Sequence, residues 1–264
     1  MLILTNGKEI NCGHIKDIRL NESLQYAAVK EDGKIAGYNV IGLGNVSDMD
    51  IVIPSSYNGK SVLDINFISA SEREQITSVV ISEGITSISD NAFNGCKYLE
   101  SVTIPDSVTA IGASAFSGCS SIESISIPSS VTTIGKGAFH NCSGLESIIV
   151  DKENPVYHSV GNCLIERESK TLIRGCKDSV IPADGSVTVI DDGAFSACSG
   201  LTNITIPVSI TAIGIRAFYF CGDPFIITYS GNKEQWLEID KTVLFESFGT
   251  HIVYFNDGSS MDVF

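Results

Sequence analysis

The sequence predicts an α/β solenoid with parallel strands, one inserted β-hairpin and terminal caps, and three observations support this fold class. The dipeptide Ala-Phe occurs five times, and a cysteine follows each Phe by three residues. The first three copies lie 23 residues apart and so do the last two, while the 56-residue gap between the two blocks equals two periods plus about ten residues. A fixed period in this range is typical of solenoids, in which each unit stacks on its neighbours. The copies are Ala92-Phe93, Ala115-Phe116, Ala138-Phe139, Ala194-Phe195 and Ala217-Phe218, with Cys96, Cys119, Cys142, Cys198 and Cys221.

Each repeat is predicted to begin with a strand. Residues 99–104 alternate apolar and polar side chains, so Leu99, Val102 and Ile104 are expected to point inward. Residues 108–111 form a second, shorter apolar stretch. Prolines end the first strand of several repeats, because proline has no N–H for the next ladder hydrogen bond. These prolines are Pro105, Pro128, Pro182 and Pro207.

A compact turn is predicted to close each repeat. Gly112, Gly135 and Gly214 follow the second apolar stretch, where we expect a turn with positive φ. Ala-Phe then opens a turn that we expect to be helical and to fill the far side of the coil. One unit cannot fold alone, because its few large apolar side chains do not offset the entropy of ordering it. The repeats must therefore stack on one another.

The eight cysteines favour a buried column over a disulfide framework. Five of them recur in one slot of successive repeats, and free cysteine is among the most buried residue types. Four disulfides remain the alternative for a secreted protein. Cys12, Cys163 and Cys176 fall outside the column, and their redox state is left open.

The period is interrupted once and lost at both ends. Two short apolar runs, Cys163 to Ile165 and Thr171 to Ile173, flank a polar turn and predict a β-hairpin inserted at about residues 151–178 of one coil. Residues 48–226 are expected to hold about six coils. The remaining segments, 1–47 and 227–264, are the predicted caps, which a solenoid needs to cover its open ends.

Charge and hydropathy narrow the class of partner. The formal net charge is -14, from 17 basic and 31 acidic residues, and no basic run occurs. Nucleic acids and anionic membranes attract clustered Lys and Arg, so neither is an expected partner. No stretch of 18 uninterrupted apolar residues or signal-peptide pattern is found, so we expect no direct membrane insertion by this chain.

No catalytic or cofactor motif is found, and we expect a non-enzymatic protein without metal or cofactor. The spacing Ser230 to Lys233 occurs in some acyl-transfer enzymes, but it lies in the predicted cap and is interpreted as a turn. Four histidines, His14, His140, His158 and His251, fall in unrelated slots, which argues against a zinc site.

The most suggestive surface pattern is a column of glutamates. Glu100, Glu123 and Glu146 occupy one slot of three successive repeats, and parallel strands lie about 4.8 Å apart. A solvated acidic edge is the simpler interpretation, and an acidic docking strip for a basic partner or a divalent cation is the sharper hypothesis. The candidate partner-binding strip comprises Glu100, Ser101, Thr103, Glu123, Ser124, Ser126, Glu146 and Ser147.

Two further features bear on glycan binding. The outward Ser and Thr side chains of the strands offer hydrogen-bonding groups, although ordinary strand-surface roles are favoured. Trp236, the single tryptophan, is interpreted as the anchor of a capping segment, helped by Leu237 and Ile239, and less readily as a sugar-stacking platform. A glycan site would need aromatic side chains along the concave face.

The 16-residue string from Ile104 to Cys119, with its 23-residue period, resembles the BspA-like (Treponema pallidum-type) leucine-rich repeats of bacterial surface proteins. The segments Tyr57 to Val62, Asn154 to Tyr157 and Tyr229 to Trp236 strengthen the resemblance, which covers about residues 51–255. It implies a right-handed leucine-rich-repeat superhelix and an exported or cell-surface protein engaged in adhesion or protein binding. It supplies no catalytic residues.

The expected function is recognition of a host matrix or surface protein, or of another bacterium, through the solenoid face. Two alternatives stay open: a structural spacer in a larger surface protein, and a glycan-binding module. Fold resemblance alone does not name the ligand.

Overall fold

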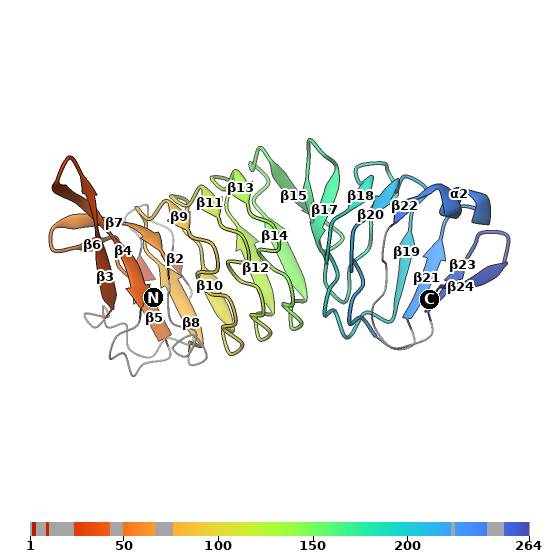
Figure 1. Cartoon of the computed structure of the whole chain (residues 1–264), viewed down its shortest axis with the longest axis horizontal. Coiled ribbons are helices and arrows are strands. Elements are labelled where there is room, and N and C mark those ends of the chain that lie inside the picture. Colours follow the sequence, from red (N-terminus) through yellow and green to blue (C-terminus); the bar gives the residue numbers. More distant parts are fainter. Residues whose placement is uncertain are drawn as a thin grey trace.

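The computed structural model describes residues 24–42, 50–66, 76–222, 225–241 and 251–263, and the backbone of β1 (Leu2–Ile3) and β2 (Glu9–Ile10), which pair antiparallel. It confirms the predicted solenoid, in which successive coils stack along the long axis of the molecule (Figure 1). Cys12 and His14 lie outside the described residues, as do the side chain of His251 and most of the segment 1–47.

One row of parallel strands runs the length of the solenoid, and we call these the main strands. In the described part of the chain there are eight, against about six coils predicted. The two additional strands, β21 and β23, follow the last Ala-Phe copy and continue the ladder without that motif. The main strands are β5 (Asp50–Ile53), β8 (Ser78–Ile81), β10 (Ser101–Thr103), β12 (Ser124–Ile127), β14 (Ser147–Val150), β19 (Asn203–Ile206), β21 (Phe225–Tyr229) and β23 (His251–Tyr254).

A second row of shorter strands lies on another side of each coil. Its members also pair in parallel, with Ala110 opposite both Ser87 and Thr133. This register places residues 23 apart in sequence beside one another, as the period predicts. The row comprises β7 (Lys60–Ile65), β9 (Ser87–Ile88), β11 (Ala110–Ile111), β13 (Thr133–Ile134), β18 (Val189–Ile190), β20 (Ala212–Ile213) and β22 (Asp240–Lys241).

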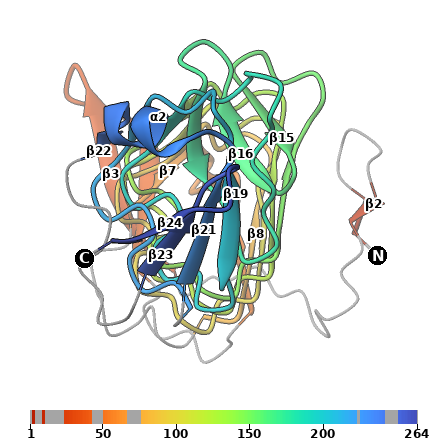
Figure 2. The same ribbon diagram turned by 90° about the vertical axis from the view of Figure 1, so that its right-hand side faces the viewer.

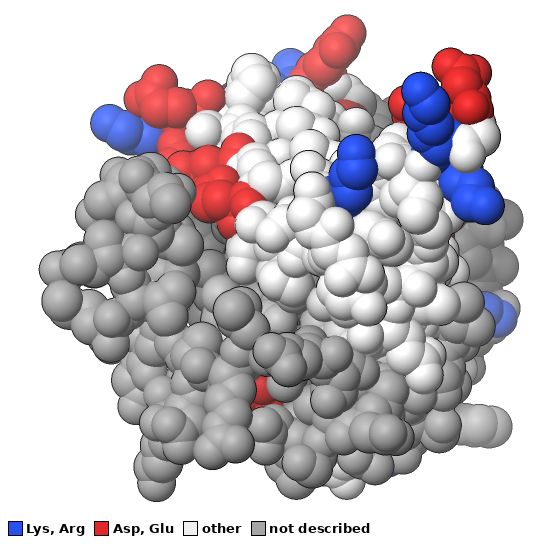
Figure 3. Space-filling view, turned by 90° about the vertical axis from the view of Figure 1, so that its left-hand side faces the viewer, with Lys and Arg blue, Asp and Glu red and all other residues white. Residues whose placement is uncertain are grey.

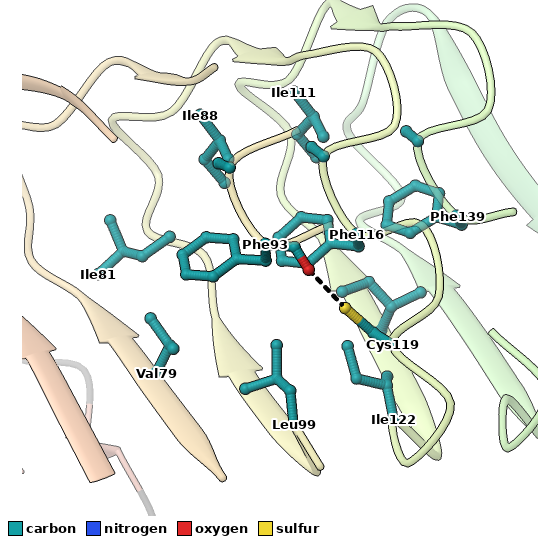
Figure 4. Packing of buried hydrophobic residues seen from close by; sticks show 14 of the residues in the cluster. Val79, Ile81, Ile88, Phe93, Leu99, Ile111, Phe116, Cys119, Ile122 and Phe139 are labelled. Atoms are coloured by element: carbon teal, nitrogen blue, oxygen red, sulfur yellow. Dashed lines mark hydrogen bonds between the residues drawn. The ribbon is translucent and has the colours of Figure 1, made fainter. Parts of the chain in front are cut away.

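The core is a stack of phenylalanine rings between the two rows of strands. Phe93 and Phe116 are stacked with centroids 5.2 Å apart, and Phe116 and Phe139 follow at 5.7 Å. Figure 4 shows these rings in a line between aliphatic side chains of both rows. The thiol of Cys119 donates to the carbonyl oxygen of Phe93 at 3.2 Å, so the cysteine column links each coil to the one before it. The predicted buried column is confirmed.

The Ala-Phe segments are turns, so the helical prediction for them is wrong. Asn91 and Gly95, on either side of the first copy, have φ of 58° and 78°. Such left-handed residues interrupt a helix. They direct the backbone N–H groups toward the next coil, as in the bond from Phe93 N to Ala115 O at 2.7 Å.

The glycines that precede these turns are required for a different reason from the one predicted. Gly112, Gly135 and Gly214 do not have positive φ. A Cβ on Gly112 would lie 2.4 Å from the backbone nitrogen of Asp90, and one on Gly135 would lie 2.3 Å from that of Ala113. The coils approach too closely at this slot for any side chain.

The predicted hairpin is confirmed, with one additional strand. β15 (Tyr157–Val160), β16 (Cys163–Glu166) and β17 (Thr171–Arg174) form an antiparallel meander, with Ile165 opposite Leu172. β17 then pairs in parallel with β18. The insertion therefore returns the chain to the row of short strands.

The insertion also separates the third Ala-Phe turn from the fourth. Elsewhere the carbonyl oxygens of a turn accept N–H groups from the preceding turn. Three other donors serve the fourth turn: His140 Nε2 bonds to Asp192 O at 2.9 Å, Gly175 N to Ala194 O at 2.9 Å, and Arg174 Nη1 to Ser196 O at 2.9 Å. Arg174 is fully buried. We call this region the junction.

Antiparallel strands lie at one end of the solenoid. The hairpin of β3 (Gln25–Glu31) and β4 (Lys34–Gly42) joins the short-strand row through β7, to which β6 (Ser56–Tyr57) also pairs. The rings of Tyr26 and Tyr57 stack 3.8 Å apart beneath it. Seen from this end, acidic and basic side chains lie in several small groups over the upper part of the described surface (Figure 3).

At the other end, β24 (Ser260–Val263) pairs antiparallel with β23. The helix α2 (Lys233–Glu238) lies beside this sheet, as Figure 2 shows. Its N-terminus forms a capping box between Asn232 and Gln235. Trp236 is fully buried against Tyr229, with ring centroids 5.3 Å apart.

Candidate functional site

The main strands bring the three predicted glutamates together. Glu100, Glu123 and Glu146 are exposed and line one hollow of about 570 Å³. A backbone bond fixes the spacing of two of them, because Glu146 N donates to Glu123 O at 2.8 Å, whereas Glu100 N donates at 2.8 Å to Thr77 O of the preceding coil. Residues that share one position in the repeat therefore also lie around one hollow of the surface.

The Ser and Thr members of the strip are arranged less evenly. Ser124 lies opposite Ser147, and Ser101 lies opposite Ser78. In the described structure β10 pairs only with β8, and β12 only with β14, so the strip consists of two hydrogen-bonded parts. Ser101, Ser124 and Ser126 are exposed, whereas Thr103 and Ser147 are half-buried.

Acidic groups dominate the charge of this hollow. Asp50 lines one side and accepts hydrogen bonds from Thr77 Oγ1 at 3.1 Å and Ser78 Oγ at 2.6 Å. Glu146 forms an ion pair with Lys177, which partly neutralises that end of the column. Among the described residues, no three His, Cys, Asp or Glu side chains are grouped to hold a metal ion. The arrangement suits a basic side chain of a partner. Unlike a metal ion, a basic side chain does not need several ligands that point at one spot.

Sequence reasoning missed an exposed apolar group on β14 and the neighbouring insertion. Ile149 on β14 is 55% exposed, and Val160 and Val180 on the neighbouring insertion are 49% and 67% exposed. Val150 N donates to Ser159 Oγ at 3.0 Å, and Val180 N donates to Gly161 O at 2.8 Å, so the three segments are adjacent. A comparison of equivalent repeat positions could have found Ile149, because it is apolar where the preceding coil has Ser126, the residue opposite it. The two valines belong to the insertion, where the period offers no comparison.

The structure tests the sequence interpretations of the segment around Trp236. Trp236 is the buried anchor of the C-terminal segment, and the sugar-platform alternative is wrong for it. Ile239 is buried beside it as expected, but Leu237 is exposed. Lys233 begins α2, one residue after its N-cap, so the stretch that starts at Ser230 is a turn leading into the helix.

The seven described cysteines are free thiols, and Cys163 and Cys176 are buried like most of the column. Burial raises the pKa of the Cys142 thiol to about 11 and that of Cys163 to about 12. Neutral thiols are poor nucleophiles and metal ligands. Burial also lowers the pKa of His140, with Arg174 nearby adding to the effect, so this imidazole stays neutral at neutral pH.

Comparison with known proteins gives one family. A sequence profile of the BspA type leucine rich repeat region matches residues 69–166 and 173–238, in six copies. No curated protein matches the sequence. None of the helices in the described residues is long and apolar enough to cross a membrane.

Similar solved structures are leucine-rich repeat proteins of bacteria. One from Bacteroides ovatus ATCC 8483 is 22% identical with a TM-score of 0.51, over 83% of this chain and 66% of that one. A leucine rich cell surface protein from Faecalibacterium prausnitzii A2-165 is 19% identical with a TM-score of 0.41, over 83% and 96%. The T. pallidum leucine rich repeat protein is 20% identical with a TM-score of 0.45, over 76% and 87%. At these identities the likeness concerns the fold alone.

Proposed function

Because the chain belongs to the BspA-type leucine-rich repeat family, we propose that it is a non-enzymatic recognition module of a bacterium, at the cell surface or secreted. Its partner is a host matrix or surface protein, or a protein of another bacterium. In this proposal residues 48–226 carry the recognition surface, and the segments 1–47 and 227–264 act as caps. A solenoid supports such a role because it offers an extended, rigid surface.

The observation that carries the proposal is that an acidic hollow and an exposed apolar side chain occur on one main strand: Glu146, which lines the hollow, directly precedes β14, and Ile149 on β14 is exposed. The segments that hold the exposed Val160 and Val180 are adjacent to this strand, through the bonds from Val150 N to Ser159 Oγ and from Val180 N to Gly161 O. An apolar centre with a charged rim is the usual anatomy of a protein interface. Burying one large aliphatic side chain contributes about 1.5–3 kcal/mol, and rim charges mainly speed association.

The partner that fits this face is a protein surface with an apolar side chain surrounded by Lys and Arg. The test is a binding panel of the purified chain against immobilised matrix and serum proteins, at low and physiological salt. We expect a saturable signal that falls as salt rises. Glu100→Gln, Glu123→Gln and Glu146→Gln combined should slow association, and Ile149→Ser should speed dissociation.

Val208→Ser is the matched control, because Val208 is also an exposed aliphatic residue but lies in the loop after β19. Its binding should equal that of the parent chain. Unchanged kinetics in both the glutamate and the Ile149 variants would refute the proposed face.

The spacer function is the second candidate. It is favoured by the small Ser and Thr side chains, such as Ser124 and Thr205, that fill most other outward positions of the main strands. Interfaces usually depend on large aromatic or Arg side chains, which the Ser and Thr positions do not supply, and Tyr254 on β23 is an exposed aromatic exception. Absence of any saturable protein signal in the panel would favour the spacer.

A further inference from the structure

The last Ala-Phe turn, residues 214–221, carries side chains unlike those of the four earlier turns. It exposes two large apolar groups, because Phe220 is 56% exposed and Ile215 is 47% exposed. Tyr219 is half-buried, and its ring centroid lies 4.1 Å from that of Phe220. At the slot of Tyr219 the earlier turns hold Asn94, Ser117, His140 and Ser196, and at that of Phe220 they hold Gly95, Gly118, Asn141 and Ala197.

The backbone at this turn is poorly suited to large residues. Phe220 has a φ of 54° at a slot that holds a left-handed residue in every turn, with Gly95 and Gly118 at 78° and 76° and the smaller Asn141 and Ala197 at 57° and 59°. Glycine adopts this left-handed region without strain, whereas a residue that carries a Cβ is strained there. Because the Phe220 ring is exposed, core packing does not offset the strain. What distinguishes Phe220 is therefore the large exposed ring at this slot, which suits contact with a ligand.

Beside the aromatic pair lies a pocket of about 320 Å³ at the junction between the two blocks of repeats. It forms where the third and fourth turns meet through side chains, as in the bond from Ser196 Oγ to Asn141 Oδ1 at 2.9 Å. The insertion is therefore the origin of the pocket. Its lining includes His140, Asn141, Asp192, Ser196, Arg216 and Tyr219.

The polar side chains around the pocket are held in place. Lys136 Nζ pairs with the Asp192 carboxylate at 2.8 Å, and the Arg216 guanidinium lies 5.5 Å from the ring centroid of Tyr219. Asn141 is exposed at the pocket, and its Oδ1 accepts the bond from Ser196 Oγ. A lining of carboxylate, amide and guanidinium groups suits a ligand with hydroxyl groups better than an apolar one.

We propose that this pocket and the adjoining aromatic pair bind a carbohydrate, one or two sugar rings in size. The C–H face of a sugar packs against Tyr219 and Phe220, while its hydroxyl groups exchange hydrogen bonds with Asn141, Asp192 and Arg216. The volume lies at the small end of the range for ligand pockets, about 300–1,000 Å³. The site shares no residue with the acidic hollow of the main strands, so it does not depend on the proposed protein partner.

The test begins with the purified full chain on a printed array of neutral and carboxylated glycans. The glycan with the strongest signal is then titrated as a soluble oligosaccharide, with saturation-transfer NMR as the readout. We expect saturable binding that becomes about tenfold weaker or more in Tyr219→Ser and in Phe220→Gly. Both variants place at these positions the residue that other turns hold there, so their thermal unfolding should match or exceed that of the parent chain.

The combined Glu100→Gln, Glu123→Gln and Glu146→Gln variant is the control that separates the two proposals. It should bind the glycan like the parent chain, even where it loses a protein partner. An array without signal would overturn the carbohydrate site, as would unchanged glycan affinity in both Tyr219→Ser and Phe220→Gly. Loss of a protein partner, with no glycan bound, would assign the aromatic pair to protein recognition instead.

Discussion

Arg174 Nη1 donates a hydrogen bond to the carbonyl oxygen of Ser196 at 2.9 Å, and its Nη2 reaches the carbonyl oxygen of Cys142 at 3.2 Å. The two acceptors belong to the two Ala-Phe turns that the insertion separates. A single guanidinium thus joins the two blocks of repeats where backbone-to-backbone bonds between turns are interrupted. Arginine suits this role because its planar group carries five donors.

Arg174→Met should destabilise the protein by about 2–3 kcal/mol, because the buried carbonyl oxygen of Ser196 would lose its donor and that of Cys142 would keep only the bond from Leu145 N. Chemical unfolding in urea measures the change. Arg167→Met, in the exposed turn of the same insertion, is the control and should cost under about 1 kcal/mol. Equal effects of the two substitutions would contradict the joining role of Arg174.

Phe116→Ala should cost about 3–5 kcal/mol, because Phe116 is stacked between Phe93 and Phe139 and its loss leaves a cavity in the core. Thermal or urea unfolding provides the measurement. Tyr98→Ala removes a ring that is largely exposed and should change stability little. A melting temperature unaffected by Phe116→Ala would rule out the stacked core.

Gly112→Ala should destabilise the solenoid by about 1–3 kcal/mol, because its Cβ would meet the backbone of Ser89 and Asp90. Gly200→Ala is the matched control, since the atoms nearest its Cβ belong to the flexible side chain of Lys177, at 3.3 Å. Urea unfolding of both variants tests the prediction. Equal stability would show that the coils can separate at this slot without cost.

Alkaline pH should lower the free energy of unfolding. Burial raises the pKa of Cys142 from 9.0 to about 11, so the folded chain keeps a proton that the unfolded chain loses. The stability is therefore complete below about pH 9 and falls as the pH rises toward 11, by about 1 kcal/mol per such thiol at pH 10. Unfolding free energies at pH 8, 9 and 10 should show this slope, and Cys142→Ala should reduce it. A slope that Cys142→Ala leaves unchanged would contradict the assignment.

Sequence alone determined the features that repeat with the period. The inward positions of Leu99 and Phe116, the cysteine column and the shared slot of Glu100, Glu123 and Glu146 all follow from the 23-residue spacing. They were predictable because stacked coils place equivalent residues next to one another, so a linear pattern becomes a spatial column. The inserted hairpin was also predictable, since its two apolar runs flank a polar turn.

Only the tertiary structure decided the features that depend on contact between different coils or on the insertion. The glycine at position 112 is explained by the backbone of the preceding coil, which no local pattern reveals. The turn at Phe93 is not helical, because its N–H groups bond to the next coil. The exposure of Ile149, the bridge made by Arg174 and the pocket beside Tyr219 arise where the insertion interrupts the stacking. Distant segments meet there, and the period carries no information about such contacts.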